Sequence, residues 1–121
     1  LLSRTQIRHG SVIEQSDLQD FDLIVANPPY IDADDKDIDP HVRQFEPPTA
    51  LFSGEKGLKD IREWTKIAYG ALRSRGLLIL EIGATQGPSA AKIFESAGFQ
   101  QVEIHRDLSG KDRVVLGISK R

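Results

Sequence analysis

The sequence predicts an α/β fold, in which helices flank a parallel sheet and the chain closes with an antiparallel hairpin strand. Two short apolar runs, residues 21–26 and 77–82, have the composition of buried strands. A segment with helical spacing follows each of them, and this alternation is typical of parallel sheets. The connection between the last two apolar segments is too short to join parallel strands, so it predicts a hairpin.

The first half of the chain is expected to contain two strands and a long loop. Residues 5–8 have the pattern of a short strand, residues 15–20 that of a turn, and residues 21–26 that of a central strand of the sheet. From residue 31 to residue 53 neither a helical nor a strand period persists, and the three prolines in this stretch interrupt any helix. A loop of this length usually carries function.

The second half is expected to contain two helices and the hairpin. Apolar residues recur at helical spacing from Leu58 to Leu72, and we expect Gly76 to supply a left-handed cap after that helix. A second helix should run from Pro88 to residue 97 and end at Gly98. The last strands should then be joined by the turn Ser109-Gly110-Lys111-Asp112.

Composition excludes several classes of protein and site. The chain has 121 residues, no cysteine and a net charge of −2, so it has neither thiol chemistry nor an overall basic field for nucleic acid. No apolar run approaches the length that a membrane span needs, and there is no secretory signal, so a cytoplasmic location is expected. The chain starts in mid-pattern at Leu1 without a methionine, which indicates a segment of something longer.

The motif that carries chemistry is Asn27-Pro28-Pro29-Tyr30, directly after the first apolar strand. The carboxyl end of a strand is where doubly wound folds bind their ligands. Consecutive prolines fix the backbone and remove N–H donors, so the prolyl carbonyls and the Asn27 side chain offer hydrogen-bond acceptors. Such a loop suits an –NH₂ group, whose plane Tyr30 could fix by stacking. The alternative is a simple turn after a strand.

An acceptor loop of this kind answers a chemical difficulty. An amide or aromatic amine nitrogen delocalises its lone pair and is a poor nucleophile. Acceptors on both of its hydrogens return electron density to the nitrogen, and alignment with a methyl donor supplies further rate enhancement. The motif therefore predicts an N-methyltransferase, with Asn27 and Pro28 as the catalytic groups.

Several longer segments resemble the HemK/PrmC family of release factor glutamine methyltransferases. The resemblance covers nearly the whole chain. It is carried by residues 21–31, 42–51, 77–83 and 107–115, which include Phe45-Glu46-Pro47 and Gly110-Lys111-Asp112-Arg113. The tetrapeptide alone is shared with DNA adenine and ribosomal RNA guanine methyltransferases, whereas the other segments point to the glutamine enzymes.

The resemblance implies a partial Rossmann-like class I methyltransferase fold, with the last strand inserted antiparallel into the sheet. It implies S-adenosylmethionine as cofactor, and as substrate the glutamine of the Gly-Gly-Gln motif in peptide-chain release factors. By the same resemblance Asn27 lies close to the cofactor as well as the substrate, and Ser11 and Val12 lie beside the adenine. Arg43 and Glu46, in the long loop, are expected either to shape the substrate site or to anchor the loop.

The resemblance also implies what this chain lacks. Residues 1–121 would be the C-terminal part of the methyltransferase domain, with the glycine-rich cofactor loop upstream of Leu1, and the isolated chain is then expected to be inactive. Residues 83–87 imitate a nucleotide loop without its glycine spacing. The aspartate-rich stretch after Ile31 has no calcium-loop spacing, so no metal site is expected.

Two other functions stay open at this stage. One is a nucleic-acid amino-methyltransferase, acting on an exocyclic nitrogen of adenine or guanine that has been flipped out of its stack. The other is a non-catalytic fragment. Missing upstream strands would also leave an apolar sheet edge open, so the chain is expected to self-associate.

Overall fold

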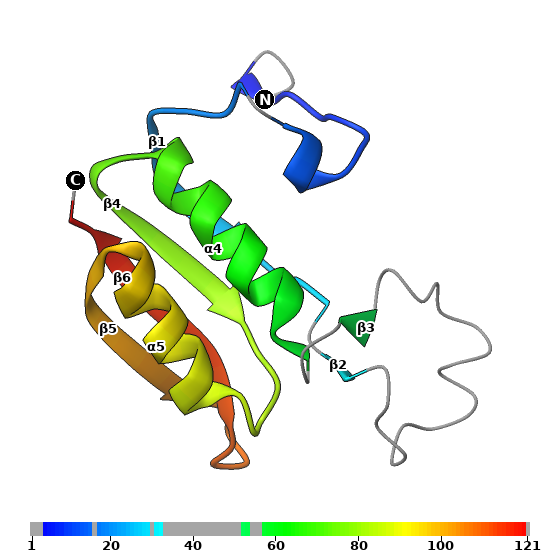
Figure 1. Cartoon of the computed structure of the whole chain (residues 1–121), viewed down its shortest axis with the longest axis vertical. Coiled ribbons are helices and arrows are strands. Elements are labelled where there is room, and N and C mark those ends of the chain that lie inside the picture. The colour runs from blue at the N-terminus through cyan, green and yellow to red at the C-terminus, as the bar shows by residue number, and fades with distance from the viewer. Residues whose placement is uncertain (1–3, 16, 30, 33–51, 54–56, 121) are drawn as a thin grey trace.

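The computed structural model describes residues 4–15, 17–29, 31–32, 52–53 and 57–120 (Figure 1). The elements follow one another along the chain as η2 (Val12–Glu14), β1 (Phe21–Ala26), β2 (Ile31–Asp32), β3 (Phe52–Ser53), α4 (Lys59–Ala71), β4 (Leu72–Glu81), α5 (Gly87–Ala97), β5 (Phe99–Arg106) and β6 (Asp112–Ser119). No helix in these ranges is long and apolar enough to cross a membrane.

The main sheet has the strand order β1-β4-β6-β5. Strands β1 and β4 are parallel, whereas β6 runs antiparallel to both β4 and β5. The predicted α/β sheet with an antiparallel last strand is therefore confirmed. The last strand lies inside the sheet, as the resemblance implied. The short strands β2 and β3 form a separate parallel pair at the two ends of the stretch that was predicted to be one loop.

Strand β1 forms where predicted, but the prediction that it is central and buried is wrong. Among the described residues it pairs with β4 alone and forms one edge of the sheet. Ile24 and Ala26 pack against the core, while Leu23 and Val25 are 51% and 67% exposed. An apolar run shows that a strand can be buried on both faces, but it does not show which neighbours are present to bury it.

The predicted strand at residues 5–8 does not form. This segment is exposed and has no strand partner among the described residues, and Ile7 is 87% exposed. A short segment with a single apolar residue buries too little surface to offset the entropy of ordering its backbone. The expected turn that follows is consistent with the turn at Asp17.

Helix α4 forms from the predicted apolar series, and its inward side buries Ile61, Thr65, Ala68 and Ala71. The Thr65 hydroxyl donates to the Ile61 carbonyl at 2.6 Å, which satisfies a buried polar group within the helix. The predicted left-handed cap at Gly76 is wrong. The helix ends at Ala71, and Leu72 is already extended, with φ −81° and ψ 143°.

Gly76 instead serves a close approach inside β4. A Cβ there would lie 2.9 Å from a Leu72 side-chain carbon and 3.1 Å from the Arg73 carbonyl oxygen. The β1–β4 pairing is irregular at this point, because Phe21 pairs with Leu72 and Leu23 with Leu77. Residues 73–76 of β4 therefore form a bulge, and Gly76 leaves space for the Leu72 side chain and the Arg73 carbonyl beside it.

Helix α5 matches its prediction, with Pro88 in its first turn and Gly98 in the left-handed conformation at its end, φ 115°. It lies on the same face of the sheet as α4 (Figure 1). Phe94 and Phe99 form the aromatic centre of the core, with ring centroids 5.2 Å apart, and Tyr69 of α4 meets Phe99 edge to face at 5.3 Å. The core therefore lies between these helices and the sheet.

Candidate functional site

Three connections meet at one end of the sheet, where β1 and β4 finish. The parallel register pairs Ala26 with Leu80, so β1 and β4 end together. Strand β6 begins at the same end of the sheet, because Val114 pairs with Glu81. The loop that starts at Asn27, the turn after β4 and the β5–β6 turn are therefore neighbours. The fold thus brings two motifs that are far apart in sequence to the same end of the sheet: the tetrapeptide and Gly110-Lys111-Asp112-Arg113.

The tetrapeptide is anchored by its first proline. Pro28 is among the fully buried side chains, Pro29 is half-buried, and Asn27 between β1 and Pro28 is exposed. No described residue makes a hydrogen bond to the Asn27 side chain. Burial of Pro28 fixes the backbone on the protein side, while the Asn27 amide remains available to a ligand. The predicted catalytic residues Asn27 and Pro28 thus lie together at the carboxyl end of β1, where they were predicted.

Three of the predicted substrate residues, Tyr30, Arg43 and Glu46, lie outside the described residues. Their expected roles stay predictions. The same holds for most of the aspartate-rich stretch, from Ala33 to His41. In the part of the chain that is described, no three His, Cys, Asp or Glu side chains are grouped closely enough to hold a metal ion.

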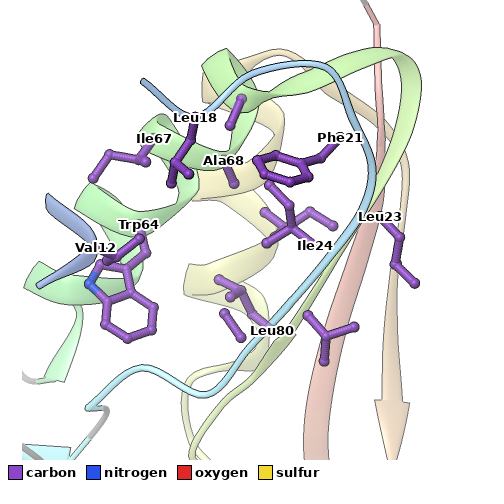
Figure 2. A pocket seen from close by; sticks show the side chains of 13 residues that line it. Val12, Leu18, Phe21, Leu23, Ile24, Trp64, Ile67, Ala68 and Leu80 are labelled. Carbon is purple, nitrogen blue, oxygen red and sulfur yellow. The ribbon is translucent and has the colours of Figure 1, made fainter. Parts of the chain in front are cut away.

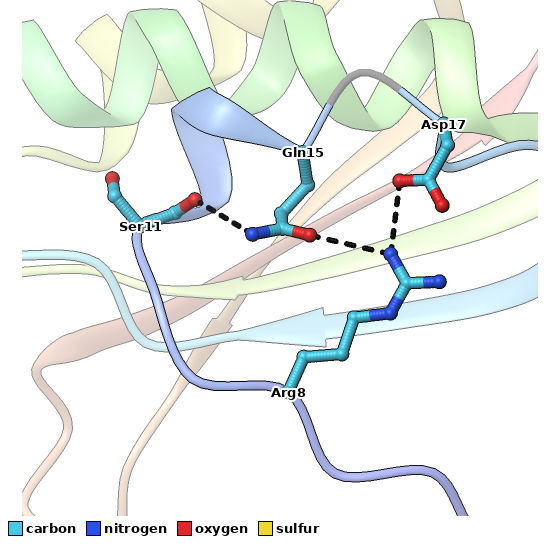
Figure 3. A network of polar contacts seen from close by, with 4 residues as sticks. All are labelled: Arg8, Ser11, Gln15 and Asp17. Carbon is cyan, nitrogen blue, oxygen red and sulfur yellow. Dashed lines mark hydrogen bonds and ion pairs between the residues drawn. The ribbon is translucent and has the colours of Figure 1, made fainter.

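Ser11 and Val12, predicted beside the adenine, lie at the start of η2. The Ser11 carbonyl accepts hydrogen bonds from the Glu14 N–H at 3.1 Å and from the Gln15 side chain at 3.4 Å. Gln15 in turn accepts from Arg8 at 3.2 Å, and Arg8 forms an ion pair with Asp17 at 2.9 Å (Figure 3). The Arg8 hydrogen bond lowers the pKa of the Asp17 carboxyl. This network holds the turn that presents Val12.

An apolar cavity of about 300 Å³ lies between η2, β1 and α4. Val12 and Trp64 lie next to each other on its wall, opposite Ile24 and Phe21 of β1 (Figure 2). Ala26, which directly precedes Asn27, lines the same cavity. The residue predicted beside the adenine and the end of the strand that carries Asn27 therefore share one apolar hollow.

The turn after β4 is closed on itself. The Gly83 N–H donates to the Gln86 side-chain oxygen at 2.8 Å, and the Gln86 N–H donates to the Gly83 carbonyl at 3.0 Å. A phosphate-binding loop needs amides that point at a ligand. The Gly83 and Gln86 amides are already bonded within the turn, so these two do not point at a ligand.

The β5–β6 turn is organised by Asp107. One of its carboxylate oxygens accepts from the backbone N–H groups of Ser109 and Lys111, at 2.9 and 3.0 Å, and the other faces Arg113 at 3.4 Å. The Lys111 hydrogen bond first, and those of Ser109 and Arg113 after it, lower the pKa of the Asp107 carboxyl. Gly110 has a φ of 81°, a conformation that glycine adopts without strain.

The sequence patterns did not reveal the roles of Asp107 in the β5–β6 turn and of Trp64 on the cavity wall. Asp107 lies two residues before Ser109-Gly110, and an aspartate at the start of such a segment is a common signal for a turn held by its side chain. Trp64 belongs to the apolar residues at helical spacing between Leu58 and Leu72, which predicts a place in the core. The structure instead places it half-buried on the cavity wall. Helical spacing identifies the inward side of α4 without separating core from cavity lining.

Curated proteins are similar to this chain in sequence. The chain is 43% identical over 101 residues to a release factor glutamine methyltransferase of Haemophilus influenzae, a match that covers 84% of this chain and 35% of that protein. It is 38% identical to the enzyme of the same name from Pseudomonas aeruginosa, covering 97% of this chain and 42% of the relative. The chain thus spans less than half the length of these curated relatives. No protein-family model matches it.

Solved structures agree on the fold. The crystal structure of a release factor-specific protein-(glutamine-N5) methyltransferase from Alicyclobacillus acidocaldarius is 27% identical, with a TM-score of 0.52, over 84% of this chain and 50% of that one. A TehB-like SAM-dependent methyltransferase from Corynebacterium glutamicum, 20% identical, has a TM-score of 0.51 over 93% of this chain and 54% of its own. The mixed sheet is therefore a partial class I methyltransferase fold, and over its own length the chain is similar in sequence to release factor glutamine methyltransferases.

Proposed function

We propose that residues 1–121 are the C-terminal, acceptor-carrying part of an S-adenosylmethionine-dependent enzyme. The proposed reaction is methylation of the side-chain amide nitrogen of the Gly-Gly-Gln glutamine in peptide-chain release factors. The observation that carries this proposal is the loop Asn27-Pro28-Pro29 at the carboxyl end of β1, with Pro28 buried and Asn27 exposed. Support comes from relatives named for this activity that are about two fifths identical.

The chemistry follows from the acceptors. The Asn27 side-chain oxygen and the Pro28 carbonyl would each accept one hydrogen of the glutamine –NH₂ group, which favours localisation of the lone pair on nitrogen. The nitrogen would then accept the methyl group that the cofactor supplies, with the carbon–sulfur bond of the donor broken, and one N–H proton would leave to solvent. Because Pro28 is held by the protein, the backbone that carries both acceptors is fixed before substrate arrives, which lowers the reorganisation needed during reaction.

The cofactor, when bound, supplies an electrophilic methyl group on a sulfonium. Val12 offers an apolar surface that suits the adenine, Ser11 lies beside it, and Asn27 would lie near the methyl group. Val12 and Ala26 line one cavity, so these residues could contact a single ligand. We propose that the remaining cofactor contacts come from a glycine-rich loop upstream of Leu1.

The test uses the complete enzyme that contains this chain, incubated with a release factor and S-adenosylmethionine. Mass spectrometry of the tryptic Gly-Gly-Gln peptide should find one added methyl group. Asn27→Ala should lower the rate by roughly a hundredfold, the scale of removing one positioned polar group. Glu95→Ala, on the exposed side of α5, is the control and should methylate normally.

An unmodified peptide beside methylated DNA or RNA would transfer the assignment to a nucleic-acid amino-methyltransferase. Full activity in Asn27→Ala would remove the proposed role of the acceptor loop.

The chain alone is proposed to be inactive, because the Gly83 and Gln86 amides of its own turn after β4 are bonded within that turn and the glycine spacing of a nucleotide loop is missing. Isothermal titration of the 121-residue chain with S-adenosylmethionine should detect little or no binding. Tight, stoichiometric binding by the isolated chain would contradict this part of the proposal.

A further inference from the structure

A groove with basic walls runs between α4 and α5, on the side of these helices away from the sheet. Two adjoining cavities of about 240 and 230 Å³ share Arg62, Ile93 and Ser96, so they form one continuous groove. The helices lie side by side over the same face of the sheet, and both start near the end of the sheet where β1 and β4 finish (Figure 1). The groove is separate from the apolar cavity that Val12 lines.

Among the residues that the structure describes, the charges that line the groove are all positive. Arg62 and Lys66 line it from α4 and Lys92 from α5. All three are exposed. The acidic residues of the same helices, Asp60, Glu63 and Glu95, are not part of the lining. The helical period explains this separation, because residues 62 and 66 lie one above the other on a single side of α4.

Other properties of the groove narrow the kind of ligand. Leu58, Ile93 and Ala97 add apolar surface, and Ser89 and Ser96 add hydroxyl groups. None of the described residues that line the groove is aromatic, so they offer no surface on which nucleic-acid bases could stack. The whole chain has a net charge of −2, which also disfavours a nucleic acid. Cations beside apolar surface suit an acidic peptide with apolar side chains.

We propose that this groove binds an acidic, amphipathic segment of a protein partner. Arg62 and Lys66 are four residues apart on a helix, which separates them by about 6 Å along its axis. Alternate residues of an extended peptide are about 6.6 Å apart, so carboxylates at alternate positions would match both cations. Lys92 approaches the segment from the opposite wall. The groove therefore recognises charge pattern through residues that are not part of the acceptor loop.

The experiment measures binding of a fluorescent peptide to the full chain by anisotropy. The probe is a short peptide with glutamates at alternate positions and leucine or alanine between them. Its counterpart with glutamine in place of every glutamate should bind at least about tenfold more weakly, and binding of the acidic probe should weaken as salt rises. A single-stranded oligonucleotide serves as the competing class of ligand.

The variant Lys66→Glu/Lys92→Glu should lose binding by about tenfold or more, since it reverses charge on both walls. The matched control is Lys59→Glu, a charge reversal on α4 outside the groove lining, and it should bind almost as well as the unchanged chain. Circular dichroism should show that all variants are folded. Equal loss in the control, no loss in the double variant, or tighter binding of the oligonucleotide would each overturn the proposal.

Discussion

The acceptor loop depends on the different environments of two adjacent residues. Pro28 is buried, so its ring holds the backbone at the end of β1, whereas Asn27 is exposed. The fixed φ of proline and the restriction that it places on Asn27 keep the intervening peptide extended. A loop of ordinary residues would have to be ordered by the substrate itself, at a cost in conformational entropy.

A second single-residue effect is the dependence of the β5–β6 turn on the charge of Asp107. Hydrogen bonds from Lys111 and Ser109 lower the pKa of this carboxyl in the folded state. Ionised Asp107 therefore stabilises the fold above its unfolded pKa of about 3.9, and this contribution is lost as the pH falls through the lower, folded value.

The measurement is chemical unfolding of the chain and of Asp107→Asn, near neutral pH and at about pH 3. The unchanged chain should be more stable than the variant near neutral pH, and the difference should shrink in acid. Ser109→Ala retains the backbone donor to Asp107 and is the control that should follow the unchanged chain. A difference that is the same at both pH values would show that the charge of Asp107 is not the cause.

At the scale of elements, the end of α5 depends on a glycine for two reasons. Gly98 has a φ of 115°, and a Cβ there would lie 2.7 Å from the Tyr69 ring. Gly98→Ala should therefore lower the free energy of unfolding by about 2 kcal/mol or more, combining backbone strain with a steric clash. Thermal or urea unfolding followed by circular dichroism measures the effect.

Gly70 provides the matched comparison, because it lies inside α4 and, apart from its own helix backbone and chain neighbours, no described atom lies within 4 Å of a Cβ built there. Gly70→Ala should leave stability unchanged or raise it by up to about 1 kcal/mol, through the higher helix propensity of alanine. If both substitutions changed stability by the same amount, the close approach of Tyr69 to Gly98 would not matter energetically.

These glycines also show how far the sequence predicted the elements. Gly98 and Pro88 bound α5 as predicted, because both act through their own backbone conformation. Gly76 was assigned the same role after α4, but its function is to admit the Leu72 side chain from within β4. Local signals thus predicted caps and turns, whereas a contact between segments could not be deduced without the fold.

The candidate site divides in the same way. The position of Asn27 after a strand was predictable, because the apolar run and the proline pair are adjacent in sequence. The proximity of the Asp107 turn does not follow from local residue patterns, since it depends on β6 lying between β4 and β5, a placement that only the family resemblance implied. The half-exposed position of Trp64 depends on the cavity that β1 and η2 form with α4.

At the scale of the whole molecule, the two faces of the sheet differ in what covers them. The row Ala26–Leu80–Val115 runs under the helices, and its β4 and β6 members are fully buried. The neighbouring row Val25–Ile79–Leu116 faces the other way, because residues one apart on a strand point to opposite faces. Val25 in that row is 67% exposed, and neither α4 nor α5 lies on this face.

This apolar row reaches the edge strand β1, whose outer side has no partner among the described residues. An unpaired edge beside an apolar face favours association with another strand. We therefore expect the chain to self-associate as its concentration rises. Val25→Lys, which places a charge on both the edge and the face, should shift the chain toward monomer in sedimentation velocity experiments.

The control for this prediction is Leu108→Lys, which adds the same charge at the tip of the β5–β6 turn, where the side chain is fully exposed. It should associate like the unchanged chain, because Leu108 lies outside the apolar row. If both variants dissociated equally, added net charge would be the cause and β1 would not be the contact. A monomer at every concentration for the unchanged chain would mean that the exposed row is too small to drive association by itself.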